Sequence, residues 1–160
     1  LIAGSKAARH DWILFLHADT VLGTGWAASV VVFASQKNSL DRAAVFTFAL
    51  DTKSKEAKRL AQIVRFRNKW LGLPYGDQGF LIHRDLLDTK EFPKIPIMED
   101  VALAGKFRGK IKSLDILAHT SAEKYHTNGW LAQSMINFFI LVQYLMGKDV
   151  HLLYKIYYKN

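Results

Sequence analysis

Two polar residues directly follow the most apolar stretch of the sequence. His17 and Asp19 come after residues 12–16 (WILFL), a run that predicts a strand. In open α/β sheets, ligands bind outside the carboxyl ends of the strands, and an aspartate there can hold Mg²⁺ or Mn²⁺, which prefer oxygen ligands and often bridge to phosphates. The alternative is structural: Asp19 caps the next turn and His17 merely ends the strand.

Two further segments carry residues that could take part in binding or catalysis. Residues 76–79 (GDQG) combine backbone freedom with an acid and an amide, which can line a polar pocket but serve equally well as a turn. Glu99 and Asp100 stand where a helix is expected to begin. A carboxylate there could act as a general base that takes the proton of a hydroxyl group, or the pair could simply stabilise the helix dipole.

Histidine is the remaining candidate metal ligand. His119 and His126 follow the last predicted strand and could complete a metal site, although lone histidines more often have structural roles. The sequence contains no Cys. This absence excludes thiol nucleophiles, Cys-ligated zinc, iron–sulfur clusters and disulfides.

These residues need a framework, and strand-like and helix-like segments alternate along the chain. The continuous apolar run at 12–16 is typical of a strand buried on both faces of a parallel sheet. The alternation that follows it favours an α/β fold. We expect helices at 26–35, 53–70 and 101–107, and strands at 43–50, 80–83 and 111–118.

The chain is basic, with 22 Lys and Arg against 14 Asp and Glu and a formal charge of +8. This balance favours acidic partners such as phosphates or anionic lipid. Residues 53–70 hold seven of the bases and one acid, Glu56. The bases form either a solvated helix face or an electropositive wall for a phosphate-bearing ligand or a membrane. We do not expect nucleic acid as a partner, because interleaved stacking aromatics and a known module are missing.

Residues 130–146 contain no charged residue. The run is interrupted by polar side chains and falls short of the roughly 20 apolar residues that span a bilayer, so we expect no transmembrane helix. Gln133, Ser134 and Asn137 share one side of the predicted helix and leave a broad apolar face opposite. The helix belongs either to the core or to a membrane surface, and the Tyr- and Lys-rich tail keeps the second alternative open.

Taken in order, three motifs resemble a branch of the family 2 glycosyltransferases with the GT-A fold. They are residues 11–20 (DWILFLHADT), 76–79 (GDQG) and 95–101 (IPIMEDV). The resemblance covers essentially the whole chain and implies an α/β fold with a Rossmann-like mixed sheet flanked by helices. It implies a single partial domain over 1–160, with an α/β catalytic part at 1–128 and an apolar helix and tail at 129–160.

The resemblance also implies roles for particular residues. Asp19 would contact Mg²⁺ or Mn²⁺ on the donor diphosphate, and His17 stands where other members often have a first aspartate. Asp100, paired with Glu99, would be the general base of an inverting transfer. A loop that shapes the donor or acceptor pocket in relatives is matched by Gly76, Asp77 and Gln78.

Two departures from the family pattern stand out. The strand–helix units that hold the nucleotide base and ribose in relatives have no counterpart, so we expect an N-terminally truncated domain. Residues 1–9 have the character of a helix end leading into a strand, and no signal peptide is recognisable. After residues 120–122 (TSA), Glu123 and Lys124 replace a basic pair, which removes or displaces one cationic contact to phosphate.

The leading hypothesis is therefore an enzyme that transfers a sugar from a UDP- or GDP-sugar donor to an acceptor of unknown identity. It would be metal-dependent and either cytoplasmic or placed at the inner face of a membrane. The alternative is a non-catalytic membrane-surface or scaffold protein that keeps the fold, which the missing units and the altered basic pair favour. Peripheral membrane contact is compatible with both hypotheses.

Overall fold

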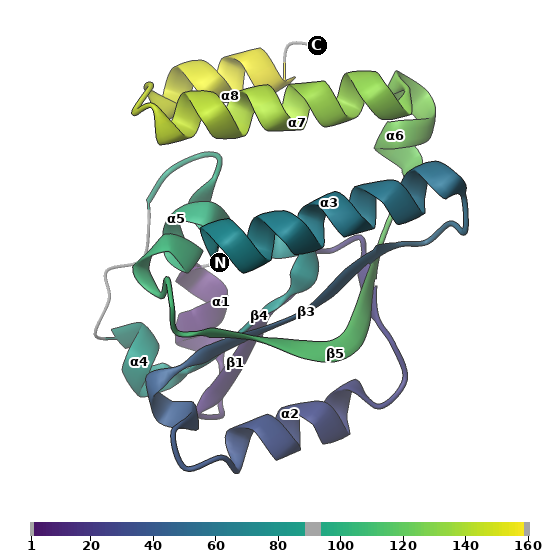
Figure 1. The fold of residues 1–160 in the computed structure, drawn as a ribbon. Coiled ribbons are helices and arrows are strands. Elements are labelled where there is room, and N and C mark those ends of the chain that lie inside the picture. The colour runs from purple at the N-terminus through teal and green to yellow at the C-terminus, as the bar shows by residue number, and fades with distance from the viewer. Residues whose placement is uncertain (1, 89–93, 159–160) are drawn as a thin grey trace.

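The structure is a computed structural model that describes residues 2–88 and 94–158. Within them, five strands form one curled mixed sheet in the order β1-β4-β3-β5-β2 (Figure 1). The central pair, β3 and β5, is parallel, and every other neighbouring pair is antiparallel. The strands are β1 (Trp12–Phe15), β2 (Thr20–Leu22), β3 (Ala43–Leu50), β4 (Phe80–His83) and β5 (Ile111–Thr120).

The prediction that the first strand is buried on both faces of a parallel sheet is wrong. β1 pairs antiparallel with β4 and, among the described residues, lies at an edge of the sheet. Ile13 is buried, whereas its three neighbours in the strand are only partly buried. An apolar run indicates apolar surroundings, but the direction of pairing depends on the path by which β4 returns, and the run does not encode this path.

Helices cover both faces of the sheet, and they confirm the helices predicted from the sequence (Figure 1). On one face lies α2 (Trp26–Ala34), and on the other lie α3 (Lys55–Leu71) and α5 (Glu99–Lys106). Local signals bound α3: the Ser54 side chain accepts a hydrogen bond from the Ala57 amide at 3.1 Å, and Gly72 ends the helix with φ of 63°. Four short helices lie between these elements or precede them: α1 (Ile2–Ala7), η1 (Ser39–Asp41), η2 (Gly76–Gln78) and α4 (Arg84–Asp88).

A register shift in the central strand pair bends β5. Phe46 lies opposite Leu114, but Thr47 lies opposite Leu117, so two residues of β5 bulge out. The Thr47 hydroxyl donates to the Leu114 carbonyl at 2.9 Å and holds the irregular segment. The bend turns the end of β5 toward the C-terminal helices, and there it delivers Thr120 (Figure 1).

The C-terminal segment packs onto this body. After α6 (Glu123–Asn128), the helices α7 (Trp130–Leu145) and α8 (Val150–Tyr158) form a hairpin above α3 and α5 (Figure 1). Leu141 of α7 packs against Leu73 and Val101. The helix predicted at 130–146 is confirmed, whereas the tail forms a second helix that the sequence did not predict. None of the helices in the described ranges is long and apolar enough to cross a membrane.

Phe33 anchors α2, and its truncation should weaken the fold. It is the only buried residue of this fully described helix and packs against Ala44, Phe46 and Leu114. We expect Phe33→Ala to lower the free energy of unfolding by about 3–5 kcal/mol, measured by urea denaturation, because it removes a buried aromatic ring and leaves a cavity. Val31→Ala on the exposed side of α2 should change it by less than about 0.5 kcal/mol. Equal effects of both variants would contradict this packing.

Candidate active site

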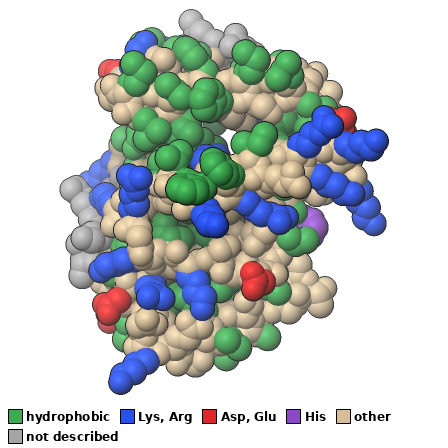
Figure 2. Space-filling model, viewed as in Figure 1, with side chains coloured by type: hydrophobic (Ala, Val, Ile, Leu, Met, Phe, Trp, Pro, Cys, Tyr) green, Lys and Arg blue, Asp and Glu red, His purple; other side chains and the backbone are tan. Residues whose placement is uncertain are grey.

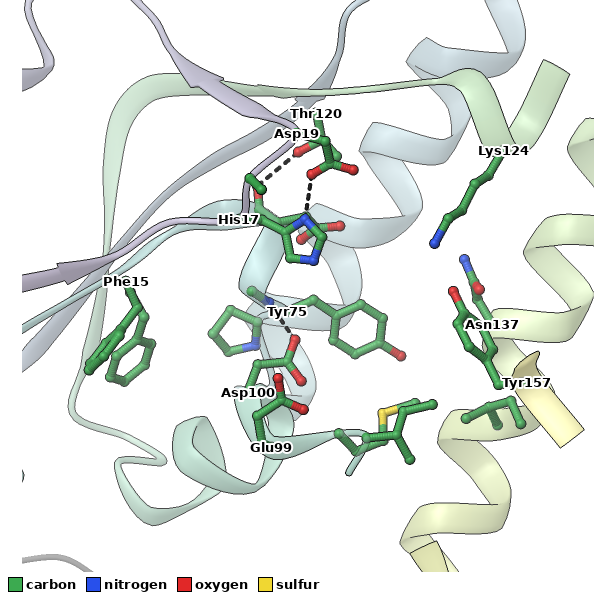
Figure 3. A pocket seen from close by; sticks show the side chains of 18 of the residues that line it. Phe15, His17, Asp19, Tyr75, Glu99, Asp100, Thr120, Lys124, Asn137 and Tyr157 are labelled. Carbon is green, nitrogen blue, oxygen red and sulfur yellow. Dashed lines mark hydrogen bonds and ion pairs between the residues drawn. The ribbon is translucent and has the colours of Figure 1, made fainter. Parts of the chain in front are cut away.

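A cavity of about 500 Å³ opens between the loop after β1, the start of α5 and the C-terminal helices (Figure 3). In the close view, His17 and Asp19 lie on one side, Glu99 and Asp100 lie on the opposite side, and the Tyr75 ring lies between them. Side chains of the C-terminal helices project from the far wall. All of the motif segments recognised in the sequence therefore contribute residues to one cavity.

The loop that carries His17 and Asp19 is held by the last strand pair. Thr20 of β2 pairs with Thr120 of β5, and their hydroxyl groups hydrogen-bond at 2.8 Å. The Ser121 amide donates to the Asp19 carbonyl at 3.1 Å. These bonds fix the loop backbone but leave the side chains of His17 and Asp19 exposed, where the His17 Nδ1 atom contacts the Asp19 carboxylate.

Backbone amides hold the Asp100 carboxylate. The Gly76 amide donates to Oδ2 at 2.5 Å, and the Val101 amide donates to Oδ1 at 2.8 Å. A Cβ atom at position 76 would lie 3.2 Å from Oδ2, so a larger residue would push the two segments apart. The contact orients the carboxylate in the cavity and leaves each oxygen a lone pair for a further hydrogen bond.

An unusual backbone conformation precedes the acidic pair. Met98 has φ of 62°, the only positive φ at a non-glycine residue in the described chain. This left-handed conformation is costly for a residue with a side chain, and such strain concentrates at functional sites. It turns the chain so that Glu99 and Asp100 begin α5 at the cavity wall.

Asp77 presents a buried carboxyl group to the same cavity. Its Oδ1 atom is inaccessible and has no hydrogen-bond partner among the described residues, although other atoms of the residue reach the surface. Burial raises the pKa of Asp77 to about 7, against the lowering effect of Arg67 and together with the raising effect of Asp100. A buried carboxyl group with a raised pKa in a cavity is typical of a functional site.

Gln78 lies elsewhere. It is buried, donates to the Phe46 carbonyl at 3.0 Å and accepts from the Asn68 side chain at 2.7 Å. It is not among the described residues that line the cavity. Its neighbours Gly76 and Asp77 do line it, so the loop divides into two cavity residues and one residue that ties α3 to β3.

The two histidines near the end of β5 also lie outside the cavity lining, as far as the described residues define it. His119 occupies β5 opposite Val21, between two buried residues whose side chains point to the other face of the strand. His126 is exposed and packs edge-on against Trp130, with ring centroids 5.5 Å apart. The structure therefore does not bring either of them to Asp19.

The donor set at the cavity suits a divalent cation in part. Across the ranges 2–88 and 94–158, no three His, Asp or Glu side chains form a ready metal site. Asp19 nevertheless offers exposed hard oxygen atoms, and the orphaned Asp77 Oδ1 atom lies within electrostatic reach of Asp19 and His17. These groups fit Mg²⁺ or Mn²⁺ when a bound phosphate supplies the remaining ligands.

A polar wall from the C-terminal helices completes the cavity. The side chain of Gln133 donates to Asn137 at 2.9 Å, and Asn137 donates to the Tyr125 hydroxyl at 3.1 Å. Burial raises the pKa of Tyr125 to about 12, so the hydroxyl keeps its proton at neutral pH and can donate it. Lys124 projects into the cavity near Tyr157, with its Nζ atom 5.6 Å from the ring centroid (Figure 3).

This wall was not predicted as part of the site. The polar side of residues 130–146 was visible in the sequence, but nothing local indicated that Gln133 and Asn137 face a cavity. The sequence also did not indicate that Tyr75 lines the cavity. The Cζ atom of the Arg67 guanidinium lies 3.7 Å from the centroid of the Tyr75 ring. Burial raises the pKa of Tyr75 to about 12.

Comparisons with protein-family models, with curated proteins and with solved structures found no significant match for this chain. The interpretation of the site therefore rests on the motifs of the sequence and on the geometry of the cavity.

Removal of the Gln78 amide should destabilise the fold. Gln78→Met keeps the volume but leaves the Phe46 carbonyl and the Asn68 amide without their partner. We expect a loss of about 1–3 kcal/mol in the free energy of unfolding, measured by urea denaturation. Gln62→Met, on the exposed side of α3, is the control and should have little effect. An unchanged stability of Gln78→Met would contradict the structural role.

The raised pKa of Asp77 predicts a pH dependence of stability. Between the unfolded value of 3.8 and the folded value of about 7, the folded state holds the proton more tightly, so stability falls as pH rises through this window. Asp77→Asn removes this titration, and its stability relative to the unsubstituted chain should increase from pH 4 to pH 8, roughly the same window. The measurement is urea denaturation with a metal chelator across that range.

The matched control for this prediction is Asp115→Asn, which removes an exposed carboxyl group on β5. A stability difference between Asp77→Asn and the unsubstituted chain that stays constant with pH would show that the Asp77 carboxyl is not held in a desolvated position.

Proposed function

We propose that the chain carries the catalytic face of an inverting glycosyltransferase that moves a sugar from a nucleotide-sugar donor to an acceptor hydroxyl. The observation that carries the proposal is the meeting of three aspartates, distant in the sequence, in one cavity. Asp19 lies in the loop between β1 and β2, Asp77 lies in η2, and Asp100 lies in the first turn of α5. All three line the cavity. They belong to the same ordered motifs that resemble the GT-A branch of the family 2 glycosyltransferases.

In the proposed reaction, Asp100 is the general base. Its carboxylate takes the proton of the acceptor hydroxyl while the hydroxyl oxygen forms a bond to the anomeric carbon of the sugar. The bond from that carbon to the diphosphate oxygen breaks, and the nucleoside diphosphate leaves with the electron pair. The two amides that bind Asp100 support this role, because they hold the carboxylate in one orientation before the acceptor arrives.

The diphosphate would bind on the opposite side of the cavity. A divalent cation held there by Asp19, with Asp77 and His17 beside it, would neutralise the charge that develops on the leaving diphosphate. Lys124 adds a positive charge on the helical wall. It is the one base at the two positions, 123 and 124, where the resembled family has a basic pair. Tyr125 can donate a hydrogen bond from the same wall. A nucleotide-sugar substrate would also imply access to the cytoplasm.

Asparagine substitutions separate the two proposed roles. Asp100→Asn should lower the rate of transfer by about 10²–10⁴-fold with donor binding nearly intact, because only the proton acceptor is lost. Asp19→Asn should instead weaken donor binding that depends on Mn²⁺. The measurements are thermal shifts with UDP, GDP and their sugars, with and without Mn²⁺, and release of UDP or GDP in the presence of a panel of hydroxyl acceptors.

The assays should include Asp115→Asn as the control that removes an exposed carboxylate away from the cavity. Undiminished transfer by folded Asp100→Asn would overturn the assignment of the base. The absence of any metal-dependent nucleotide shift in the folded chain would overturn the proposed function and favour a non-catalytic protein.

A further inference from the structure

Helix α7 turns both polar and apolar residues inward and a second apolar side outward. Gln133 is buried and Asn137 partly buried, and both line the cavity. The opposite side is apolar: Leu131 is 75% exposed and Phe138 is 68% exposed. Ile140 and Leu141 of the same helix are buried, so α7 contributes to the core as usual but also exposes a second apolar side where an amphipathic helix of a globular protein is normally polar.

A second apolar stripe lies on α3. Ile63, Phe66 and Trp70 are spaced three and four residues apart, so they share one side of the helix, and Phe66 and Trp70 are each 66% exposed. The rings of Phe66 and Trp70 contact each other, with centroids 5.8 Å apart. The buried side of this helix is formed by other residues, Ala57, Ala61 and Val64.

Helices α3 and α7 both run along the side of the molecule that faces the viewer in Figure 1. Figure 2 shows hydrophobic side chains gathered over α7 and α3, with Lys and Arg side chains among them over α3. The exposed bases of α3 include Lys58, Arg59, Arg65 and Lys69, and its only acid is Glu56. The combination of exposed aromatic side chains and bases without matching acids is typical of helices that lie in the interface of an anionic bilayer.

We infer that the outer sides of α3 and α7 form a docking face for an anionic lipid surface. The apolar side chains of both stripes enter the boundary between headgroups and acyl chains, and the bases of α3 pair with lipid phosphates. The face consists of Ile63, Phe66 and Trp70 with the bases of α3, and of Leu131, Met135 and Phe138 of α7.

Charge favours a lipid surface over a second copy of the chain. In a symmetric dimer through this face, the same patch lies opposite itself, and the bases of α3 would meet bases. An anionic bilayer offers the opposite charge to the same residues and an apolar layer for the aromatic side chains. Patches of exposed apolar surface this extended are rare on monomers that have no partner.

The inference goes beyond sugar transfer and does not depend on it. Because α7 lines the cavity with one side and forms the docking face with the other, docking places the cavity about one helix diameter, roughly 10 Å, from the lipid. A catalytic and a non-catalytic protein would dock in the same way.

Vesicle co-sedimentation of the chain tests the inference. We expect binding to vesicles made of equal parts phosphatidylcholine and phosphatidylglycerol, little binding to phosphatidylcholine alone, and weaker binding at high salt. Lys58→Gln, Arg65→Gln and Lys69→Gln in one variant should lower partitioning on the order of a hundredfold. Phe66→Ser, Trp70→Ser and Phe138→Ser in a second variant should lower it by at least about tenfold.

Two control variants match these sets. Val31→Ser with Val32→Ser removes comparably exposed apolar side chains from α2 on the other face of the sheet, and Lys37→Gln with Arg42→Gln and Lys110→Gln removes three exposed bases outside α3. Both controls should bind like the unsubstituted chain. Circular dichroism verifies that each variant is folded.

Three results would overturn the inference. They are the absence of sedimentation with anionic vesicles, equal binding to both kinds of vesicle, and equal losses in the test and control variants. A concentration-dependent dimer that the apolar variant abolishes, in a chain that ignores vesicles, would assign the face to a second copy instead.

Discussion

The cavity depends on the contact between the Gly76 amide and the Asp100 carboxylate. This bond joins η2, which follows α3, to the first turn of α5, two segments that no strand pairing connects. It is favoured by the small residue at position 76, where a Cβ atom would lie 3.2 Å from the Asp100 Oδ2 atom, and Met98 adopts the left-handed conformation just before the acidic pair. With this contact in place, Asp77 and Asp100 line the same cavity.

Burial has the largest effect on the protonation of Asp77 in this site. Burial and the nearby Asp100 and Asp19 all favour the protonated form of Asp77, and Arg67 only partly offsets them. Arg67 also contacts Tyr75, since its guanidinium lies 3.7 Å from the centre of the Tyr75 ring. The raised pKa of the Asp77 carboxyl group therefore follows mainly from its desolvation.

Helix α7 connects the cavity with the surface. Its inner side supplies the hydrogen-bonded row of Gln133 and Asn137 that ends at the Tyr125 hydroxyl, whereas Leu131 and Phe138 on its outer side are left to solvent. Buried amide side chains are stable only when they are paired, and this row satisfies that condition. The helix therefore gives up part of the usual gain from apolar burial to build a polar cavity wall.

Local patterns in the chain are sufficient to specify most helices and strands. The Ser54 cap, Gly72 at the helix end and the apolar run of β3 all act over a few positions, so α3 and β3 form close to where they are expected. The motif residues Asp19, Asp77, Glu99 and Asp100 also reach one cavity as expected. Long-range packing decides what remains: the antiparallel pairing of β1, the inward side chain of Gln78, the absence of His119 and His126 from the described cavity lining, and the side of α7 that faces the cavity. Each of these depends on which distant segment a side chain meets, and the spacing of neighbours along the chain does not encode such contacts.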